Sequence, residues 1–426
     1  MNHDILKAVI YDQHDVISQT RIVHRRYTLD PQANYVVTGL RRAGKSTLLY
    51  DMAQRLVARG VSWDRIIYVG FEDERLAEFT QQDFNDILLV QQELSTEPGY
   101  FFLDEVQNVT GWEKFARRLA DSGRRVYITG SNATMLSGQI ASTLGGRYLI
   151  KQISPYRFDE YLDAQGQSHS KRDLLATRQV GSILRHFEQF YQQGGFPESL
   201  RYESPRTYVE SVYQKVLLGD VAARNSIRNV QLLRIMMKKI AETVCNTLSA
   251  SSLHGTLKAL GLSCSKDTLI AYLDYVKEAY LLFSITNTVA KFVEREGNPK
   301  YYFSDNGLLN LFLFDRDTAL LENEVAIALR DVYGDDLHYL ESPKTGIDID
   351  FYVPSAHLAV QVAYSIEGAA RTREVENLVR LSRVQDDIER FLILTKQEEE
   401  TIEIEGIAIE VIPVWKYLLK EYSLQG

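Results

Sequence analysis

The stretch Y-V-V-T-G-L-R-R-A-G-K-S-T, residues 35–47, decides how the first part of this chain folds. It runs from apolar β-forming residues through a glycine and four further residues to Gly44, Lys45 and Ser46, which is the pattern G-x-x-x-x-G-K-[ST]. The two glycines let the backbone curl so that successive N–H groups point at a polyphosphate, and the following helix adds the positive end of its dipole. The stretch therefore predicts a strand, a phosphate loop and a helix.

This loop predicts that the ligand is ATP with Mg²⁺. Lys45 is expected to reach the β and γ phosphates, and the Ser46 hydroxyl to bind the magnesium ion. The residues expected to surround the nucleotide are Gly39, Leu40, Arg41, Arg42, Ala43, Gly44, Lys45, Ser46 and Thr47.

A second strand, at residues 100–105, ends in two carboxylates, Asp104 and Glu105. Ligands of open α/β sheets bind at the carboxyl ends of the strands, so Asp104 is expected to hold Mg²⁺, directly or through water. Glu105 is expected to polarise the attacking water. Because Asp followed by Glu is the pairing of a hydrolysing ATPase, the sequence predicts ATP hydrolysis.

A third strand, at residues 125–132, ends in small polar residues. Ser131 and Asn132 would lie between the two earlier strand ends, where they could sense the γ-phosphate. A simple turn from strand to loop explains Gly-Ser-Asn equally well. Helical patterns alternate with these strands, which predicts a parallel sheet. A leader helix within residues 1–34 is expected to pack beside the first strand.

The 426-residue chain has an ordinary composition, with 45% hydrophobic and 25% charged residues. It has no run of eighteen apolar residues and no signal-peptide order at its start, so neither a membrane span nor secretion is expected. Its two cysteines, Cys245 and Cys264, form no metal or disulfide pattern. A reducing cytoplasm fits best.

The formal net charge of −9 is unevenly distributed. Residues 228–300 contain ten Lys and Arg against six Asp and Glu, whereas residues 301–426 contain eleven against twenty-four. The middle of the chain is therefore mildly basic and the tail strongly acidic. A solvated helical face accounts for the basic middle as well as a nucleic-acid contact does.

Four motifs carry a resemblance to a known family: G-L-R-R-A-G-K-S-T, F-L-D-E-V-Q-N-V-T-G-W-E, I-T-G-S-N-A and L-G-G-R-Y-L-I-K-Q-I-S-P-Y-R-F-D-E-Y. The chain resembles prokaryotic AAA+ ATPases of the AAA_14 type that carry a trailing DUF4143 domain. The resemblance implies a homo-oligomer, in ring form, in which a neighbouring subunit supplies an arginine to the ATP site. Arg147 is the candidate for that arginine, although a surface or fold-stabilising role remains open. The resemblance also makes residues 161–228 a helical lid.

Residues 229–303 read as three helices and two strands, with a Gly-containing turn before Ser265, as in a winged helix-turn-helix. The residues expected to contact DNA are Ser265, Lys266, Thr268, Lys291 and Arg295, with Lys300 near the base of the wing. Winged helices also serve protein contacts, and that alternative stays open.

The tail, residues 304–426, is similar to the core of the PD-(D/E)xK nuclease fold. Asp350 ends one strand, and the next strand carries Gln361-Val362-Ala363 where an active nuclease would have a lysine. Without that cation, metal-dependent cleavage is not expected, and the domain is predicted to be a scaffold, a DNA-junction module or a protein-binding module.

Together these patterns predict an α/β protein: a P-loop AAA+ parallel sheet (1–160), a helical lid (161–228), a winged helix (229–303) and a small restriction-endonuclease-like α/β domain (304–426). The predicted function is a Mg²⁺-dependent ATPase that binds DNA and translocates on it or remodels it, including branched DNA. The alternative is a nucleotide-controlled oligomeric switch in defence or signalling that acts on a protein partner.

Overall fold

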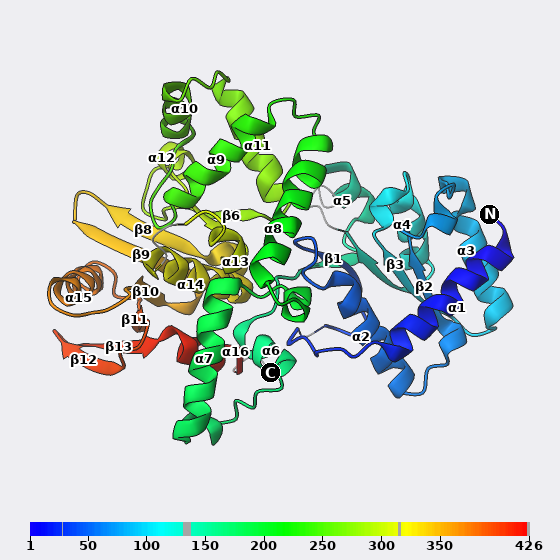
Figure 1. The fold of residues 1–426 in the computed structure, drawn as a ribbon, viewed down its shortest axis with the longest axis horizontal. Helices are drawn as coiled ribbons and strands as arrows, with labels where there is room; N and C mark the ends of the chain where they lie inside the picture. Colours follow the sequence, from blue (N-terminus) through cyan, green and yellow to red (C-terminus); the bar gives the residue numbers. More distant parts are fainter. Residues whose placement is uncertain (28, 131–137, 314–316, 424–426) are drawn as a thin grey trace. The chain divides into compact units, whose positions relative to one another are not determined.

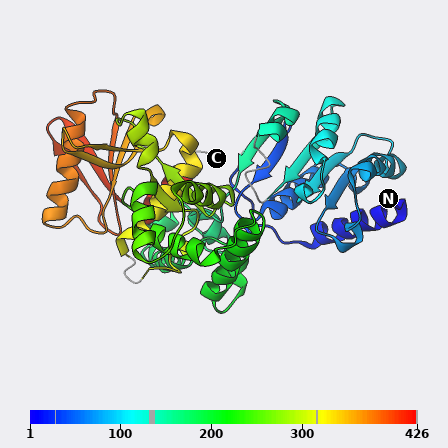
Figure 2. The ribbon, with the colours of Figure 1, turned by 90° about the horizontal axis from the view of Figure 1, so that it is seen from above.

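A computed structural model of the chain describes residues 1–27, 29–130, 138–313 and 317–423. The chain divides into two compact units, Met1–Ile153 and Ser154–Gly426. Figure 1 labels the helices and strands of both units, and Figure 2 gives the same ribbon from above. The finer division into four domains remains a prediction.

The first unit is built on a five-stranded sheet in the order β2-β3-β4-β1-β5, with every neighbouring pair parallel. Its strands are β1 (Asn34–Thr38), β2 (Ile66–Gly70), β3 (Tyr100–Asp104), β4 (Arg125–Thr129) and β5 (Tyr148–Gln152). Alternate residues of a strand face opposite sides of a sheet. Val36 and Phe101 thus enter one hydrophobic core and Tyr35 and Phe102 the other. Apolar residues on both faces explain why these strands are apolar throughout.

Helices cover both faces of this sheet. They are α1 (His3–Gln19), α2 (Lys45–Ala58), α3 (Phe84–Leu94), α4 (Trp112–Asp121) and α5 (Gly138–Leu144). Buried residues of α3 and α4 belong to one core and those of α2 to the other, while α1 contributes Leu6, Val9 and Ile10 to the first core and Ile17 to the second. The predicted α/β fold with a parallel sheet is confirmed.

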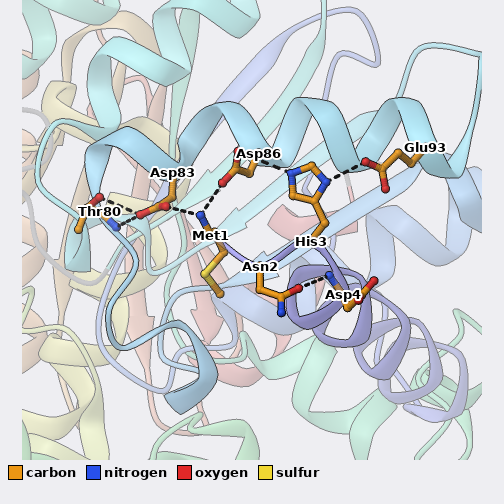
Figure 3. A network of polar contacts seen from close by, with 8 residues as sticks. All are labelled: Met1, Asn2, His3, Asp4, Thr80, Asp83, Asp86 and Glu93. Atoms are coloured by element: carbon orange, nitrogen blue, oxygen red, sulfur yellow. Dashed lines mark hydrogen bonds and ion pairs between the residues drawn. The ribbon is translucent and has the colours of Figure 1, made fainter.

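The leader helix α1 does not lie where the sequence analysis expected it. It packs against β2 and α3, and His14 Nε2 lies 2.7 Å from the Ile66 carbonyl oxygen of β2. Since β3 and β4 separate β2 from β1, the expected position beside the first strand is wrong. Figure 3 shows the contacts that hold the start of α1 to α3: the Met1 amino group donates to Asp83 and Asp86, both at 2.6 Å.

The second unit begins with helices, as expected: α6 (Phe158–Ala164), α7 (Thr177–Gln193) and α8 (Pro205–Lys215), the last continued by a π-helical segment, Val216–Ala223. Then come α9 (Val230–Glu242), α10 (Ala250–Ala259), α11 (Lys266–Glu278) and an antiparallel hairpin of β6 (Leu282–Ile285) and β7 (Lys300–Phe303). The connection within the hairpin holds a short helix, α12 (Phe292–Gly297).

A six-stranded mixed sheet, in the order β12-β13-β11-β10-β9-β8, completes the second unit. Its strands are β8 (His338–Ser342), β9 (Ile347–Val353), β10 (Leu358–Val362), β11 (Arg390–Thr395), β12 (Glu400–Ile404) and β13 (Ile407–Pro413). Its helices are α13 (Asn306–Leu309), α14 (Asp317–Tyr333), α15 (Ala369–Ser382) and α16 (Val414–Ser423). The backbone of Tyr339 in β8 bonds to Thr286 and Thr288, each at 3.2 Å, so the chain leaving β6 pairs with this sheet.

Candidate active site

The phosphate loop follows β1 at the carboxyl edge of the sheet, and two of its positions require glycine. Gly39 has φ +138°, and a Cβ atom there would lie 2.1 Å from the Ile153 carbonyl oxygen. Gly44, which caps α2, has φ +97°. Residues that carry a side chain rarely adopt such φ values. The backbone conformation therefore requires glycine at both positions, in addition to the need for phosphate to approach the loop closely.

Lys45 is buried, and its Nζ donates to the carbonyl oxygens of Gly39 at 3.1 Å and Leu40 at 3.2 Å. The ammonium group therefore lies inside the curl of the loop, where the motif requires it to meet phosphate oxygens. Arg41 is turned toward Glu72, with 3.3 Å between its Nη2 and Oε1 of that residue. Arg42 adopts a left-handed conformation with φ +67°.

Asp104, the last residue of β3, is buried and accepts hydrogen bonds from two hydroxyl groups. Tyr68 donates its hydroxyl to Asp104 Oδ2 at 2.7 Å, and Thr129 donates its hydroxyl to Oδ1. The Ser46 hydroxyl lies close enough to lower the pKa of Asp104 as well. Burial raises the pKa of Asp104, and these hydrogen bonds act against the rise because they favour the ionised form.

Ser46 and Asp104 thus bring a hydroxyl and a carboxylate oxygen together beside the phosphate loop. Such oxygen ligands are the ones that Mg²⁺ prefers, and phosphates and water complete its shell in nucleotide sites. The donor set therefore fits Mg²⁺. Among the described residues, no group of three or more His, Cys, Asp and Glu side chains is arranged to hold a metal. A magnesium ion at this place would depend on the nucleotide for further ligands.

Glu105 follows Asp104 in a left-handed conformation, with φ +51° and ψ +41°. Its backbone N–H donates to Thr129 Oγ1 at 2.9 Å, and its carboxylate accepts a hydrogen bond from Gln107 Nε2. The Thr129 hydroxyl therefore links the Asp104 carboxylate, to which it donates, to the backbone N–H of Glu105, from which it accepts. The arrangement brings together Lys45, Ser46, Asp104 and Glu105 at the carboxyl edge of the sheet.

Thr129, Tyr68 and Gln107 were not predicted from the sequence. Thr129 is the first residue of the T-G-S-N run that ends its strand, so the polar strand end was a signal, but the prediction placed it at Ser131 and Asn132. Tyr68 lies within an apolar strand and gave no separate signal. Gln107 belongs to the D-E-V-Q run, in which only Asp104 and Glu105 were predicted to have a role. Ser131 and Asn132, the predicted sensor residues, lie outside the described residues.

Arg147 lies apart from the other predicted catalytic residues of its unit. It directly precedes β5, whose first residue, Tyr148, is paired with Asn34 at the start of β1. The phosphate loop follows the opposite end of β1, so Arg147 is at the amino edge of the sheet and the loop at the carboxyl edge. The Arg147 guanidinium forms an ion pair with Asp121 at the end of α4.

Three of the predicted DNA contacts gather at the start of α11. Ser265 caps this helix: its side chain accepts from the Thr268 backbone N–H at 3.1 Å. Lys266 is exposed, and its Nζ lies 3.1 Å from Ser251 Oγ. Lys291 and Arg295 lie elsewhere, in the connection between β6 and β7, where Lys291 caps α12.

Lys300 corrects one expectation. It is only 4% exposed, so it is not available to DNA at the base of a wing. Its Nζ lies 3.6 Å from Asp350 Oδ1, and the Asp350 Oδ2 atom accepts from the Val362 backbone N–H at 2.9 Å. The lysine that approaches Asp350 thus comes from β7, whereas the Gln361-Val362-Ala363 stretch has none.

Comparisons with known proteins agree with the first unit. The family model AAA_14, described as an AAA domain, matches residues 32–162. A second model, a domain of unknown function named DUF8612, matches residues 184–318. The expected DUF4143 domain is not confirmed by these matches.

Two relatives align over nearly the whole chain. An uncharacterized protein of Haemophilus influenzae is 32% identical over 401 residues, which cover 90% of this chain and 94% of the relative. The uncharacterized protein MJ1544 of Methanocaldococcus jannaschii is 28% identical over 434 residues, covering 97% of this chain and 95% of the relative.

Among solved structures, the Walker-type ATPase PABY2304 of Pyrococcus abyssi is 16% identical at a TM-score of 0.43, covering 70% of this chain and 99% of its own. The Orc1 protein of Aeropyrum pernix, solved in complex with DNA, is 16% identical at a TM-score of 0.27, and the match covers 75% of this chain and 93% of the Orc1 chain. Likenesses at such TM-scores carry no weight for the function of this chain.

The helices in the described ranges are all too short or too polar to cross a bilayer. The phosphate loop, the buried Asp104 beside Ser46 and the AAA domain match agree on the class of the first unit. The chain belongs to the same family as the Haemophilus influenzae protein, and it is a P-loop ATPase of the AAA type.

Proposed function

We propose that this chain is a Mg²⁺-dependent AAA+ ATPase that couples ATP hydrolysis to translocation on DNA or to remodelling of DNA, branched DNA included. The observation that carries the ATPase half is that Ser46 and Glu105 flank the buried Asp104 beside the phosphate loop, where Thr129 donates to Asp104 and accepts from the Glu105 backbone N–H. The residues assigned to the metal ion and to the attacking water therefore lie close together there.

The proposed role of each residue follows from its charge and from its position beside the phosphate loop. Lys45 binds phosphate oxygens, Ser46 and Asp104 hold Mg²⁺, and Glu105 accepts a proton from the attacking water. The magnesium ion, when bound, offsets the negative charge that develops on the phosphate oxygens. Ser131 and Asn132 keep their proposed role as γ-phosphate sensors.

A homo-oligomer, in ring form, is the assembly that the position of Arg147 supports. This residue lies at the edge of the sheet opposite the phosphate loop of its own chain. An arginine placed there can act on ATP only in a neighbouring copy, which is how arginine fingers supplied in trans work. Its ion pair with Asp121 would have to break first.

The DNA half of the proposal rests on the start of α11. The exposed Lys266 and the hydroxyl groups of Ser265 and Thr268 share a helix N-terminus, where backbone N–H groups also favour phosphate. Lys291 and Arg295 would add contacts from the hairpin connection. The acidic tail is proposed as a non-cleaving nuclease-like module, because Ala363 stands where an active nuclease would have a lysine.

The test is steady-state ATP hydrolysis by the wild type and by Glu105→Gln, without DNA and with single-stranded, duplex and four-way-junction DNA. Stimulation by one DNA form, lost in Glu105→Gln, is the expected result and would identify the substrate. Hydrolysis at the same rate with every DNA would refute the coupling to DNA.

A second candidate function is a nucleotide-controlled oligomeric switch acting on a protein partner, in defence or signalling. The excess of acidic residues in the tail, twenty-four against eleven basic ones, favours it because such a surface repels DNA. The switch would show slow hydrolysis that is indifferent to DNA and that changes when a protein partner is added.

A further inference from the structure

Gln107 lies in the short turn Val106–Asn108 that follows β3 and Glu105. Its Nε2 donates to Glu105 Oε2. Its other amide atom, Oε1, is buried and, in the described part of the chain, has no hydrogen-bond partner. The orientation of this amide follows from chemistry, since an ionised carboxylate only accepts hydrogen bonds and must face the NH₂ group.

The turn that carries Gln107 is firmly held. Glu105 is fixed in its left-handed conformation by the bond from its N–H to Thr129 Oγ1 at 2.9 Å. Val106 is fully buried, and Asn108 Nδ2 donates to the Phe71 carbonyl oxygen at 3.4 Å. A left-handed conformation at a residue other than glycine costs energy and persists only where the surroundings enforce it. The pairing of Gln107 with Glu105 is therefore set by the fold.

A buried amide oxygen without a donor destabilises a protein, so its presence at this place calls for a ligand. The ligand would have to be a hydrogen-bond donor that also lies near the Glu105 carboxylate. Water is such a donor, and the water that attacks ATP has two O–H groups. A general base accepts one of them, and the orientation of the molecule is fixed only if a second acceptor takes the other.

We propose that Gln107 is a positioning residue for hydrolysis: its Nε2 fixes the Glu105 carboxylate, and its Oε1 accepts the second O–H of the attacking water. This inference rests on the proposed ATP hydrolysis. As the water oxygen bonds to the γ-phosphorus, the bond from phosphorus to the bridging oxygen breaks and ADP leaves with its electron pair. Glu105 takes the transferred proton, while Gln107 exchanges none.

The experiment compares kcat for ATP, measured without DNA, in the wild type, Gln107→Leu, Gln107→Glu, Glu105→Gln and the double variant Gln107→Leu/Glu105→Gln. Binding of a fluorescent ATP analogue is measured for each. Gln107→Leu keeps the shape of the side chain and loses both hydrogen bonds, and Gln107→Glu keeps an acceptor but loses the donor. We expect kcat to fall about 100-fold in Gln107→Leu, the size of effect that such groups contribute, with analogue binding unchanged.

The double variant separates positioning from general structure. If Gln107 acts through Glu105 and its water, the Leu substitution lowers kcat much less in the Glu105→Gln background than in the wild type. The matched control is Gln82→Leu, the same substitution at an exposed glutamine of the same unit, which should retain wild-type kcat.

Three results would overturn the proposal. The first is a wild-type kcat in Gln107→Leu, and the second is a Gln107→Leu variant that loses analogue binding together with kcat. The third is a fold-loss of kcat from Gln107→Leu that is the same in the Glu105→Gln background as in the wild type. The readout uses the basal rate, so failure of DNA to stimulate hydrolysis refutes only the coupling to DNA. A wild type that binds the analogue but hydrolyses no ATP under any condition would refute the hydrolytic function and this role of Gln107 together.

Discussion

The Lys300 ammonium group, on β7, lies 3.6 Å from the Asp350 carboxylate, on β9, and thereby ties the β6–β7 hairpin to the six-stranded sheet. Burial disfavours the charged lysine, but the charges of Asp350, Glu322 and Asp348 outweigh it and raise the pKa of Lys300. Lys300 therefore stays charged. Burial and the neighbouring Glu322 raise the pKa of Asp350, and the charge of Lys300 acts against this rise.

Replacing Lys300 by Met should destabilise the second unit, because it leaves buried carboxylates without their cation. The expected loss is about 3–5 kcal/mol in free energy of unfolding, measured by chemical denaturation. Adding Asp350→Asn should recover part of the loss. The control is Lys291→Met, at an exposed lysine of the same hairpin connection. Equal stability of Lys300→Met and wild type would show that the pair contributes nothing.

Thr129→Val removes the hydroxyl that orients Asp104 while keeping the shape of the side chain. Groups that orient a metal ligand typically contribute about 10–100-fold to metal affinity or activity. We expect the Mg²⁺ concentration for half-maximal ATP hydrolysis to rise by a factor in that range. Thr110→Val, at an exposed threonine of the same unit, is the control. An unchanged Mg²⁺ dependence would exclude the role assigned to Thr129.

Glu324 should make the second unit less stable as the pH rises. Burial, with the charges of Asp305 and Asp331, raises the pKa of Glu324 from 4.5 to about 8. Between these two values the folded chain binds a proton that the unfolded chain has lost, so the free energy of unfolding falls as the pH increases.

Glu324→Gln removes this titration. The difference in melting temperature, variant minus wild type, should therefore be larger at pH 8 than at pH 5. Thermal unfolding at both values measures the difference, and Glu210→Gln, at an exposed glutamate of the same unit, is the control. If the gap between Glu324→Gln and wild type is the same at both pH values, Glu324 does not titrate in this way.

Two residues at the start of α11 should respond differently to substitution. Ser265→Ala removes a helix cap and should cost about 1 kcal/mol in free energy of unfolding with or without DNA. Lys266→Ala should leave stability unchanged, weaken DNA binding and reduce the slope of log affinity against log salt by about 1. Lys277→Ala, near the other end of the same helix, is the control. A slope unaltered by Lys266→Ala would place the DNA contact elsewhere.

The sequence by itself determined the local elements of the candidate site. The phosphate loop, the strand ending in Asp104 and Glu105, and the order of helices and strands could be predicted, because each depends on neighbours along the chain. The glycines show this most clearly, since the φ angles of Gly39 and Gly44 are local properties of the loop. The cap at Ser265 is local in the same way.

Only the tertiary structure decided which side chains meet across strands. Thr129 and Tyr68 reach Asp104 because β2, β3 and β4 are neighbours, and the order of strands in a sheet is not encoded in any one strand. Lys300 meets Asp350 because the β6–β7 hairpin folds onto the sheet that contains β9. Arg147 lies at the edge opposite the phosphate loop because β5 runs parallel to β1. The direction of β5 relative to β1 therefore decided which ATP site Arg147 could contact, and the L-G-G-R motif does not contain this information.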